Sequence, residues 1–205
     1  LNVNNFTVKC SRKSMAGSDC GGFLLDGNAD NITIRNIEFE NGYNQIKIVE
    51  SDGAVIEYCT FTAYKYGIRM YGDGSGTAGA GSVTVRYCEL TPNSFSLRSG
   101  YTSKHFEFGA LLWKAQKEFG DMDLLGIYFA GTKGGHHIHD NYLHDAWDGI
   151  GGGGPAGDWK NSEVNHNLIV NCLDDPIEIF GDCSNGKVHH NVSINSQQLT
   201  RIRAT

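Results

Sequence analysis

Short apolar runs separated by polar turns recur along most of the chain. Residues 136–150 read HHIHDNYLHDAWDGI, and residues 164–179 read VNHNLIVNCLDDPIEI. Each segment contains an alternating polar and apolar run, an Asn, a second run, an acidic turn and a third run. Self-similarity at a period of about 20 to 50 residues is typical of repeat architectures, in which each unit stacks on the next.

The repeat can be aligned on one column of positions. This column consists of Ile37, Cys59, Cys88, Asn141, Asn167 and Asn191. Neighbouring members are 22 to 29 residues apart, except for a gap of 53 residues between Cys88 and Asn141. Each unit holds two or three short strands and no helix that could return the chain to a parallel strand, so its strands must stack on those of the next unit.

We therefore predict an all-β fold, a right-handed parallel β-helix (solenoid) of about seven coils, with the handedness that crossovers between parallel strands prefer. It forms a single domain over residues 1–205, and we expect a fragment of a longer solenoid because the repeat reaches both ends. A short helix or decorated coil is expected near residues 102–125, where the apolar spacing is helix-like. Asn141, Asn167 and Asn191 should stack inward, since each amide can bond the one above and below.

The repeated signatures at 138–150 and 164–179 resemble the right-handed parallel β-helix repeats of the pectin-lyase-like superfamily, over roughly residues 3–205. The resemblance implies a fold, whereas function has to come from the site, because the superfamily holds lyases, hydrolases, epimerases, phage spikes and adhesins. Asp148-Gly149-Ile150 and Asp174-Asp175 are similar to the acidic turns of polygalacturonase-like hydrolases. The Gly-His-Gly of those enzymes does not follow, and Arg201-Ile202-Arg203 arrives one coil too early.

Charge and hydropathy narrow the range of partners. The formal net charge is −6, which argues against nucleic acid as a partner. No stretch of 18 apolar residues is present, so we predict no membrane insertion. We expect a polysaccharide partner, and a homo-oligomer or filament is a further possibility.

The cysteines and sequons favour a secreted or cell-surface protein. Cys59 and Cys88 share the aligned column, about 4.8 Å apart by strand spacing, which is within disulfide reach. Two further disulfide candidates close local loops, Cys10–Cys20 and Cys172–Cys183. The alternative is that these cysteines are small apolar residues of the ladder. Asn5 and Asn31 are the glycosylation candidates, because the third sequon, at Asn191, belongs to the inward Asn column.

An acidic cluster is the first candidate for chemistry. Asp148 and the pair Asp174-Asp175 occupy the same turn in adjacent coils, and Glu178 points outward on the following strand. Stacking should place these carboxylates roughly 5–6 Å apart, which suits general acid–base catalysis or a shared cation. The candidate cofactor is calcium, held by Asp174 and Asp175. The alternative interpretation is that Asp-Gly here is turn chemistry.

A column of basic residues is the candidate substrate-binding surface. Counting from the aligned column gives Lys47, Arg69, Arg98, Gly151, Glu178 and Arg201 on one outward face. Such a row suits a polyanionic chain, because Arg recognises carboxylates bidentately. Tyr128 and Trp147 complete the candidate set. The alternative is a mixed charged face that prevents association between sheets.

Histidines form two further outward columns. His139 shares one column with His189, and His166 shares the next with His190. Close histidines can bind a transition metal, whereas stacking of polar rings in a ladder is the simpler interpretation.

Taken together, these features predict an extracellular β-helix domain that binds, and cleaves or epimerises, an acidic polysaccharide as a lyase, hydrolase or epimerase. The alternative is a non-catalytic structural or adhesive β-helix.

Overall fold

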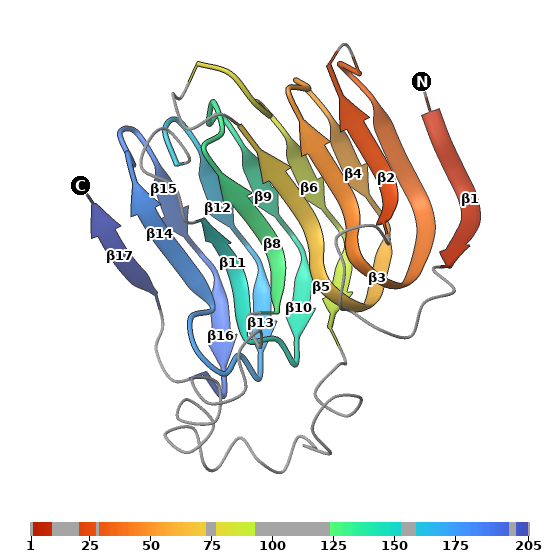
Figure 1. Ribbon diagram of the computed structural model, residues 1–205. Helices are drawn as coiled ribbons and strands as arrows, with labels where there is room; N and C mark the ends of the chain where they lie inside the picture. The colour runs from red at the N-terminus through yellow and green to blue at the C-terminus, as the bar shows by residue number, and fades with distance from the viewer. Residues whose placement is uncertain are drawn as a thin grey trace.

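The computed structural model describes residues 2–9, 21–27, 29–72, 77–92, 124–152, 159–196 and 200–204. Every regular element in these residues is a β-strand, and every pairing between strands is parallel. Figure 1 shows the strands side by side in one curled sheet, with β1 at one end and β17 at the other. The strands are β1 (Asn2–Lys9), β2 (Gly21–Asp26), β3 (Thr33–Val49), β4 (Val55–Glu57), β5 (Thr60–Tyr71), β6 (Thr84–Arg86), β7 (Glu89–Thr91), β8 (Leu125–Ala130), β9 (His137–His139), β10 (Tyr142–His144), β11 (Asp148–Gly152), β12 (Glu163–Asn165), β13 (Leu168–Val170), β14 (Ile177–Gly181), β15 (Lys187–His189), β16 (Val192–Ile194) and β17 (Arg201–Ala204).

The strands stack in three ladders, and successive strands of each ladder come from successive coils. The first ladder joins β3, β4, β6, β9, β12 and β15. The second joins β3, β5, β7, β10, β13 and β16. The third joins β2, β3, β5, β8, β11, β14 and β17, and β1 pairs with the first half of β3. The predicted all-β parallel β-helix is therefore confirmed.

The register corrects the position given to Arg98. In the third ladder Arg69 pairs with Tyr128, and Tyr128 pairs with Gly151. Tyr128 therefore occupies the place that the sequence count assigned to Arg98, since the wide gap is an insertion between β7 and β8 of one coil. Arg98 itself, and the short helix expected near residues 102–125, fall in the gap 93–123 between the described residues.

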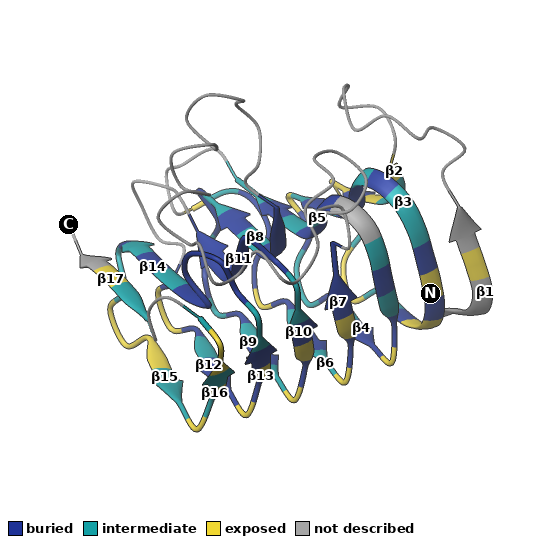
Figure 2. Cartoon of the chain, turned by 90° about the horizontal axis from the view of Figure 1, so that it is seen from below, coloured by how far each residue is buried: buried dark blue, intermediate teal, exposed yellow. Residues whose placement is uncertain are grey.

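Apolar side chains fill the inside of the coil. Alternate residues of the third ladder are buried, including Ile46, Ile68, Ile150 and Ile177. Figure 2 shows buried positions along the strands and exposed positions at the outer turns. Phe39 and Phe61 stack across one rung with ring centroids 4.8 Å apart. Each fully buried side chain of this size contributes about 1.5–3 kcal/mol, so the rung-to-rung stack supplies the main stabilisation.

The turn between the first and second ladders carries the predicted Asn stack. The Nδ2 atom of Asn141 donates to Oδ1 of Asn167 at 3.0 Å, and that of Asn167 donates to Oδ1 of Asn191 at 2.9 Å. The residue before each Asn has a left-handed backbone, with φ of 54° at Asp140 and 53° at His166. The inward amides satisfy backbone groups that the tight turn leaves unpaired, which confirms the predicted stacking of the three asparagines.

The cysteines agree with the predicted stacking but not with predicted disulfides. Cys59 and Cys88 are buried in adjacent coils, and their thiols donate to the backbone carbonyl oxygens of Glu57 and Arg86 at 3.3 and 3.2 Å. They are free thiols, as are Cys172 and Cys183, so the structure contains neither predicted bridge among these four residues. Burial raises the pKa of the Cys88 and Cys172 thiols well above its ordinary value, as expected for small apolar residues of the core. Cys10 and Cys20 lie outside the described residues.

The predictions of glycosylation and of no membrane insertion concern the surface of the protein. Asn31 is exposed in a left-handed turn with φ of 56°, so its side chain is accessible. Asn5 lies on β1, and glycosylation of either residue remains a prediction. Among the described residues there is no helix long and apolar enough to cross a membrane.

Candidate active site

The third ladder brings the predicted acidic residues together where its strands begin. Ile150 pairs with Ile177, so Asp148 and Asp175 lie at the same level of adjacent coils. Carboxylate oxygens of Asp148, Asp174 and Asp175 all lie within 4.8 Å of one another. All three side chains are buried, and Asp175 is the most enclosed, with 1% of its surface exposed. Three buried carboxyl groups this close to one another repel each other when charged. At least one must therefore be protonated, or a cation must neutralise them.

Asp148 has a structural role in this cluster. Its Oδ1 accepts a hydrogen bond from the backbone N–H of Asp175 at 3.0 Å, which ties the two turns together. Burial raises its pKa well above the ordinary value for a carboxyl group. This contact agrees with the interpretation of Asp148 as a turn residue, because an Asp side chain readily caps such a turn.

Asp175 and Glu178 form a different arrangement, in which a guanidinium is the partner. Oδ2 of Asp175 accepts a hydrogen bond from Nη1 of Arg201 at 3.2 Å, and Oε1 of Glu178 lies 3.7 Å from the same nitrogen. Oδ1 of Asp175 is buried and has no hydrogen-bond partner in the described structure. A buried oxygen left without a donor is costly, so it marks a place where a substrate, proton or ion can be accommodated.

The electrostatics of this pair favour a shared proton. Burial raises the pKa of Glu178 to about 8, and the adjacent negative charge of Asp175 contributes to the rise. Burial also raises the pKa of Asp175, although Arg201 opposes this shift. The interactions with Asp175 and Glu178 outweigh desolvation and raise the pKa of Arg201. At neutral pH the site therefore holds a protonated Glu178 beside a charged guanidinium.

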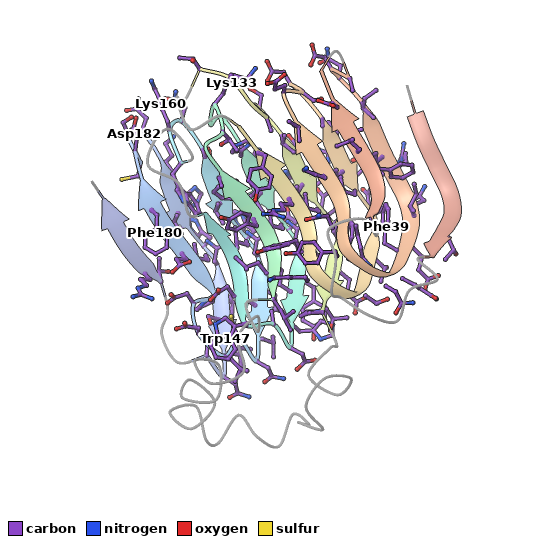
Figure 3. The ribbon with its side chains drawn as sticks, in the orientation of Figure 1. Phe39, Lys133, Trp147, Lys160, Phe180 and Asp182 are labelled. Atoms are coloured by element: carbon purple, nitrogen blue, oxygen red, sulfur yellow. The ribbon has the colours of Figure 1, made fainter. Side chains whose placement is uncertain are left out.

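Trp147 is buried, which disagrees with a place on an open binding surface, and its role in substrate binding stays a prediction. Its side chain is only 1% exposed, and Figure 3 shows it at the lower end of the strands. Its backbone carbonyl accepts hydrogen bonds from the Asp174 N–H at 2.9 Å and from the Cys172 thiol at 3.0 Å. A tryptophan beside the acidic turn is therefore part of the core that supports the turn, and sequence spacing alone does not distinguish the two positions.

Beside the predicted basic column lie Tyr128, a predicted candidate, and Tyr66 and Tyr71, which the sequence analysis missed. The guanidinium of Arg69 lies 4.3 Å from the ring centroid of Tyr66, 4.2 Å from that of Tyr71 and 5.7 Å from that of Tyr128. The ammonium of Lys47 lies 5.8 Å from the Tyr71 ring. We refer to these five residues as the tyrosine–cation platform. The sequence signal that could have indicated this platform is the presence of Tyr66 and Tyr71 on either side of Arg69.

The platform carries positive charge without acidic partners. In the part of the chain that the structure describes, no ion pair to a carboxylate involves Lys47 or Arg69. Nη1 of Arg69 donates to the neutral Oδ1 of Asn44 at 3.3 Å, and its Nε is buried without a hydrogen-bond partner. Cations held against aromatic faces and not neutralised by a carboxylate are suited to bind an anionic ligand.

Both cations of the platform lie on the same column of the third ladder as Glu178 and Arg201. The column runs through Lys47, Arg69, Tyr128, Gly151, Glu178 and Arg201. Strands lie about 4.8 Å apart, so Arg69 and Glu178 are separated by three rungs, or about 14 Å. Gly151, the residue between Tyr128 and Glu178 in this column, has no side chain. A ligand of several sugar units is long enough to span this distance.

Near the last described coil, a hollow of about 220 Å³ is lined by residues that include Ile169, Pro176, Ile177 and Asn191. Its lining is mixed, because His189, His190 and Ser193 also border it. No family model matches the sequence, and no curated protein or solved structure is significantly similar to it. The functional argument therefore rests on the residues themselves.

Proposed function

We propose that this chain is a carbohydrate-active β-helix domain, similar to the pectin-lyase-like superfamily, that hydrolyses glycosidic bonds in an acidic polysaccharide outside the cell. The observation that carries the proposal is the arrangement of two carboxyl groups, Asp175 and Glu178, around the guanidinium of Arg201 at 3.2 and 3.7 Å. Burial, which raises the pKa of Glu178 to about 8 and favours its protonated form, supports it. A carboxylic acid kept neutral by burial is the typical proton donor of a glycosidase.

The roles follow from the charges of the three side chains. Glu178 donates its proton to the leaving glycosidic oxygen, while the Asp174-Asp175 pair supplies the carboxylate that activates water or stabilises the developing positive charge. Arg201 binds the carboxylate of the sugar or balances the acidic pair, since it contacts both Asp175 and Glu178. Asp148 positions Asp175 through its backbone N–H.

A hydrolase fits these residues better than a lyase or an epimerase. Both of the latter need a base that removes the proton at C5 of a uronate. Arg201, the basic residue that contacts the pair, has a raised pKa and remains protonated, and Glu178 already carries a proton. The pair is therefore better prepared to donate a proton than to accept one.

The tyrosine–cation platform is the proposed binding site for the rest of the polysaccharide. Lys47 and Arg69 meet carboxylate or sulfate groups of the glycan, while Tyr66, Tyr71 and Tyr128 pack against sugar rings. Because Lys47, Arg69 and Glu178 share one column, the glycan runs along the solenoid across the strands.

Binding of calcium is a second proposed role for the same acidic residues. Asp148, Asp174 and Asp175 offer oxygens close enough to share one cation, and Oδ1 of Asp175 is unpaired. Calcium prefers six to eight oxygen ligands, so water or a sugar carboxylate would have to complete the site. A bound cation would neutralise the cluster and orient the substrate.

The test is a panel of polyuronates and sulfated glycans, with a neutral glucan as the negative substrate. Reducing ends and ultraviolet absorbance are followed in parallel, with and without a chelator. A hydrolase gives reducing ends without the absorbance of an unsaturated product, and Glu178→Gln should lose at least about 100-fold in rate. Glu38→Gln, at an exposed position of β3, is the matched control.

Two outcomes would change the assignment. Unsaturated products would identify a lyase, and loss of activity with the chelator would give calcium a direct role. If the panel gives no product and Asp175→Asn only lowers thermal stability, the hydrolase proposal fails.

The second candidate is a non-catalytic structural or adhesive β-helix, assembled as a homo-oligomer or filament. It is favoured by the bond from the Asp175 N–H to Asp148, and by the burial of all three aspartates. In that case the acidic turn is a clamp between coils. Arg69→Ala then leaves glycan binding unchanged, which separates the two candidates.

A further inference from the structure

A cluster of histidines lies on the first ladder and the turn that follows it, away from the acidic strands of the third ladder. His139 and His189 face outward on β9 and β15, with Asn165 of β12 paired between them. His166 and His190 follow β12 and β15 directly, and their rings stack with centroids 5.2 Å apart. Asn165 is buried, whereas His189 is partly accessible and His166 and His190 are exposed; β15 itself has no buried position (Figure 2).

The closest pair within this cluster is His189 and His190. Their Nδ1 atoms lie 2.7 Å apart, so two imidazole nitrogens converge on one point. Nε2 of His189 lies 3.0 Å from Oε1 of Glu163. A carboxylate only accepts hydrogen bonds, so this contact places the proton of a neutral His189 on Nε2, and the lone pair of its Nδ1 then accepts the hydrogen bond from Nδ1 of His190.

The carboxylate behind His189 makes the arrangement more than a stack of polar rings. Histidines that bind metals usually donate their second N–H to a carboxylate, which fixes the tautomer and strengthens the metal bond. Glu163 is itself held by Nδ2 of Asn165 at 2.8 Å, so its position is defined. Stacking alone requires neither the carboxylate nor the convergence of the two Nδ1 atoms.

We infer that His189 and His190 form a binding site for a divalent transition-metal ion of the Zn²⁺ class, with Glu163 as the positioning residue. The ion takes the place of the proton between the two Nδ1 atoms, and neutral His190 then carries its proton on Nε2. Zn–N bonds of about 2.0–2.1 Å in tetrahedral geometry need the two nitrogens to separate to about 3.3 Å, a small rotation of each ring. The His189 side chain is 37% exposed, so this rotation meets little resistance. Water or a ligand from outside the chain fills the remaining positions.

The chemistry of the pair sets the choice of ion. Imidazole nitrogens suit zinc, copper and nickel, whereas calcium and magnesium prefer oxygen ligands. The site is thus distinct from the acidic cluster in both position and preferred ion, and it does not depend on the proposed hydrolase function.

The experiment is a calorimetric titration of the full chain with Zn²⁺ at pH 7.5, repeated at pH 5 and with Mg²⁺. The matched variants are His189→Gln, His190→Asn, His139→Gln and Glu163→Gln, and Asn at position 190 tolerates the left-handed turn with φ of 53°. His139 is the control because its Nδ1 contacts Asp140, at 2.7 Å, and not a second histidine.

We expect one Zn²⁺ site at pH 7.5 that is lost at pH 5, where the imidazoles compete for protons, and no response to Mg²⁺. His189→Gln and His190→Asn should abolish this site and His139→Gln should retain it, while Glu163→Gln weakens it by about 10-fold or more. Absence of Zn²⁺ binding by the unchanged chain overturns the inference. So does a Zn²⁺ site that survives both His189→Gln and His190→Asn.

Discussion

Replacing Asn167 by Ala tests whether the inward Asn stack holds successive coils together. The Asn167 side chain is 1% exposed, and its amide makes five hydrogen bonds. Its Oδ1 accepts from the backbone N–H and the Nδ2 of Asn141, at 3.1 and 3.0 Å. Its Nδ2 donates to the carbonyl oxygens of Ile138 and Asn165 and to Oδ1 of Asn191.

The magnitude follows from what the substitution leaves unpaired. The backbone N–H of Asn141 loses its acceptor in a buried turn, which costs about 1–3 kcal/mol. Nδ2 of Asn141 keeps a second acceptor, the carbonyl oxygen of Val85 at 2.9 Å, so only the net value of that bond is lost. The lost bond from Nδ2 of Asn141 contributes about 1 kcal/mol, and the two N–H groups of Asn167, which three acceptors share, contribute about 2 kcal/mol together, so we expect a loss of about 5 kcal/mol in the free energy of unfolding. For a domain of this length that corresponds to a fall of about 15 °C in Tm.

The matched control is Asn165→Ala, two residues earlier on the same rung. Asn165 is also largely buried, and its amide bonds Glu163, His137 and His166. All three partners are side chains that can turn to water, so the loss should stay near 1 kcal/mol. Thermal and urea unfolding of both variants, followed by circular dichroism, measure the difference. Equal shifts in the two variants, or a change below about 3 °C for Asn167→Ala, would refute the argument that the stack satisfies the buried turn.

Two further predictions concern the third ladder. The Glu178 carboxyl has an ordinary pKa of 4.5 that rises to about 8 in the fold, so the folded protein binds the extra proton and its stability should fall as pH rises between these values; Glu178→Gln should flatten this slope in urea titrations, and an unchanged slope would show that Glu178 does not hold the proton. A Cβ at Gly149 would lie 2.5 Å from the backbone oxygen of Pro176, whereas one at Gly151 meets its nearest atom at 3.4 Å. Gly149→Ala should therefore cost about 1–3 kcal/mol and Gly151→Ala much less, and similar Tm values for the two variants would contradict the packing of these strands.

The sequence by itself determined the repeat and the orientation of its side chains. The period of the aligned column, from Cys88 through Asn141 to Asn191, and the alternation of apolar residues are local properties. They were sufficient to predict parallel stacking, the inward Asn column and the contact between Cys59 and Cys88, because each coil repeats the geometry of the one before. The same register also predicted that Asp148 lies beside Asp174 and Asp175 in the adjacent coil.

The tertiary structure decided which strand continues the third ladder across the wide gap. Sequence spacing gave that place to Arg98, whereas Arg69 pairs with Tyr128. An insertion changes the count of residues without changing the stack, so counting fails wherever a coil is interrupted. The pairing then brings Tyr128 against Tyr66, with ring centroids 5.3 Å apart, beside the cation of Arg69.

Burial was the other property that only the structure supplied. Trp147 reads as a candidate for sugar binding, but it is enclosed in the core, and Asp148 is tied to a backbone amide. The raised pKa of Glu178 depends on desolvation and on the charge of Asp175, which lies three residues before it along the chain. Periodicity specifies which residues share a level and a face, whereas protonation and exposure depend on everything packed around them.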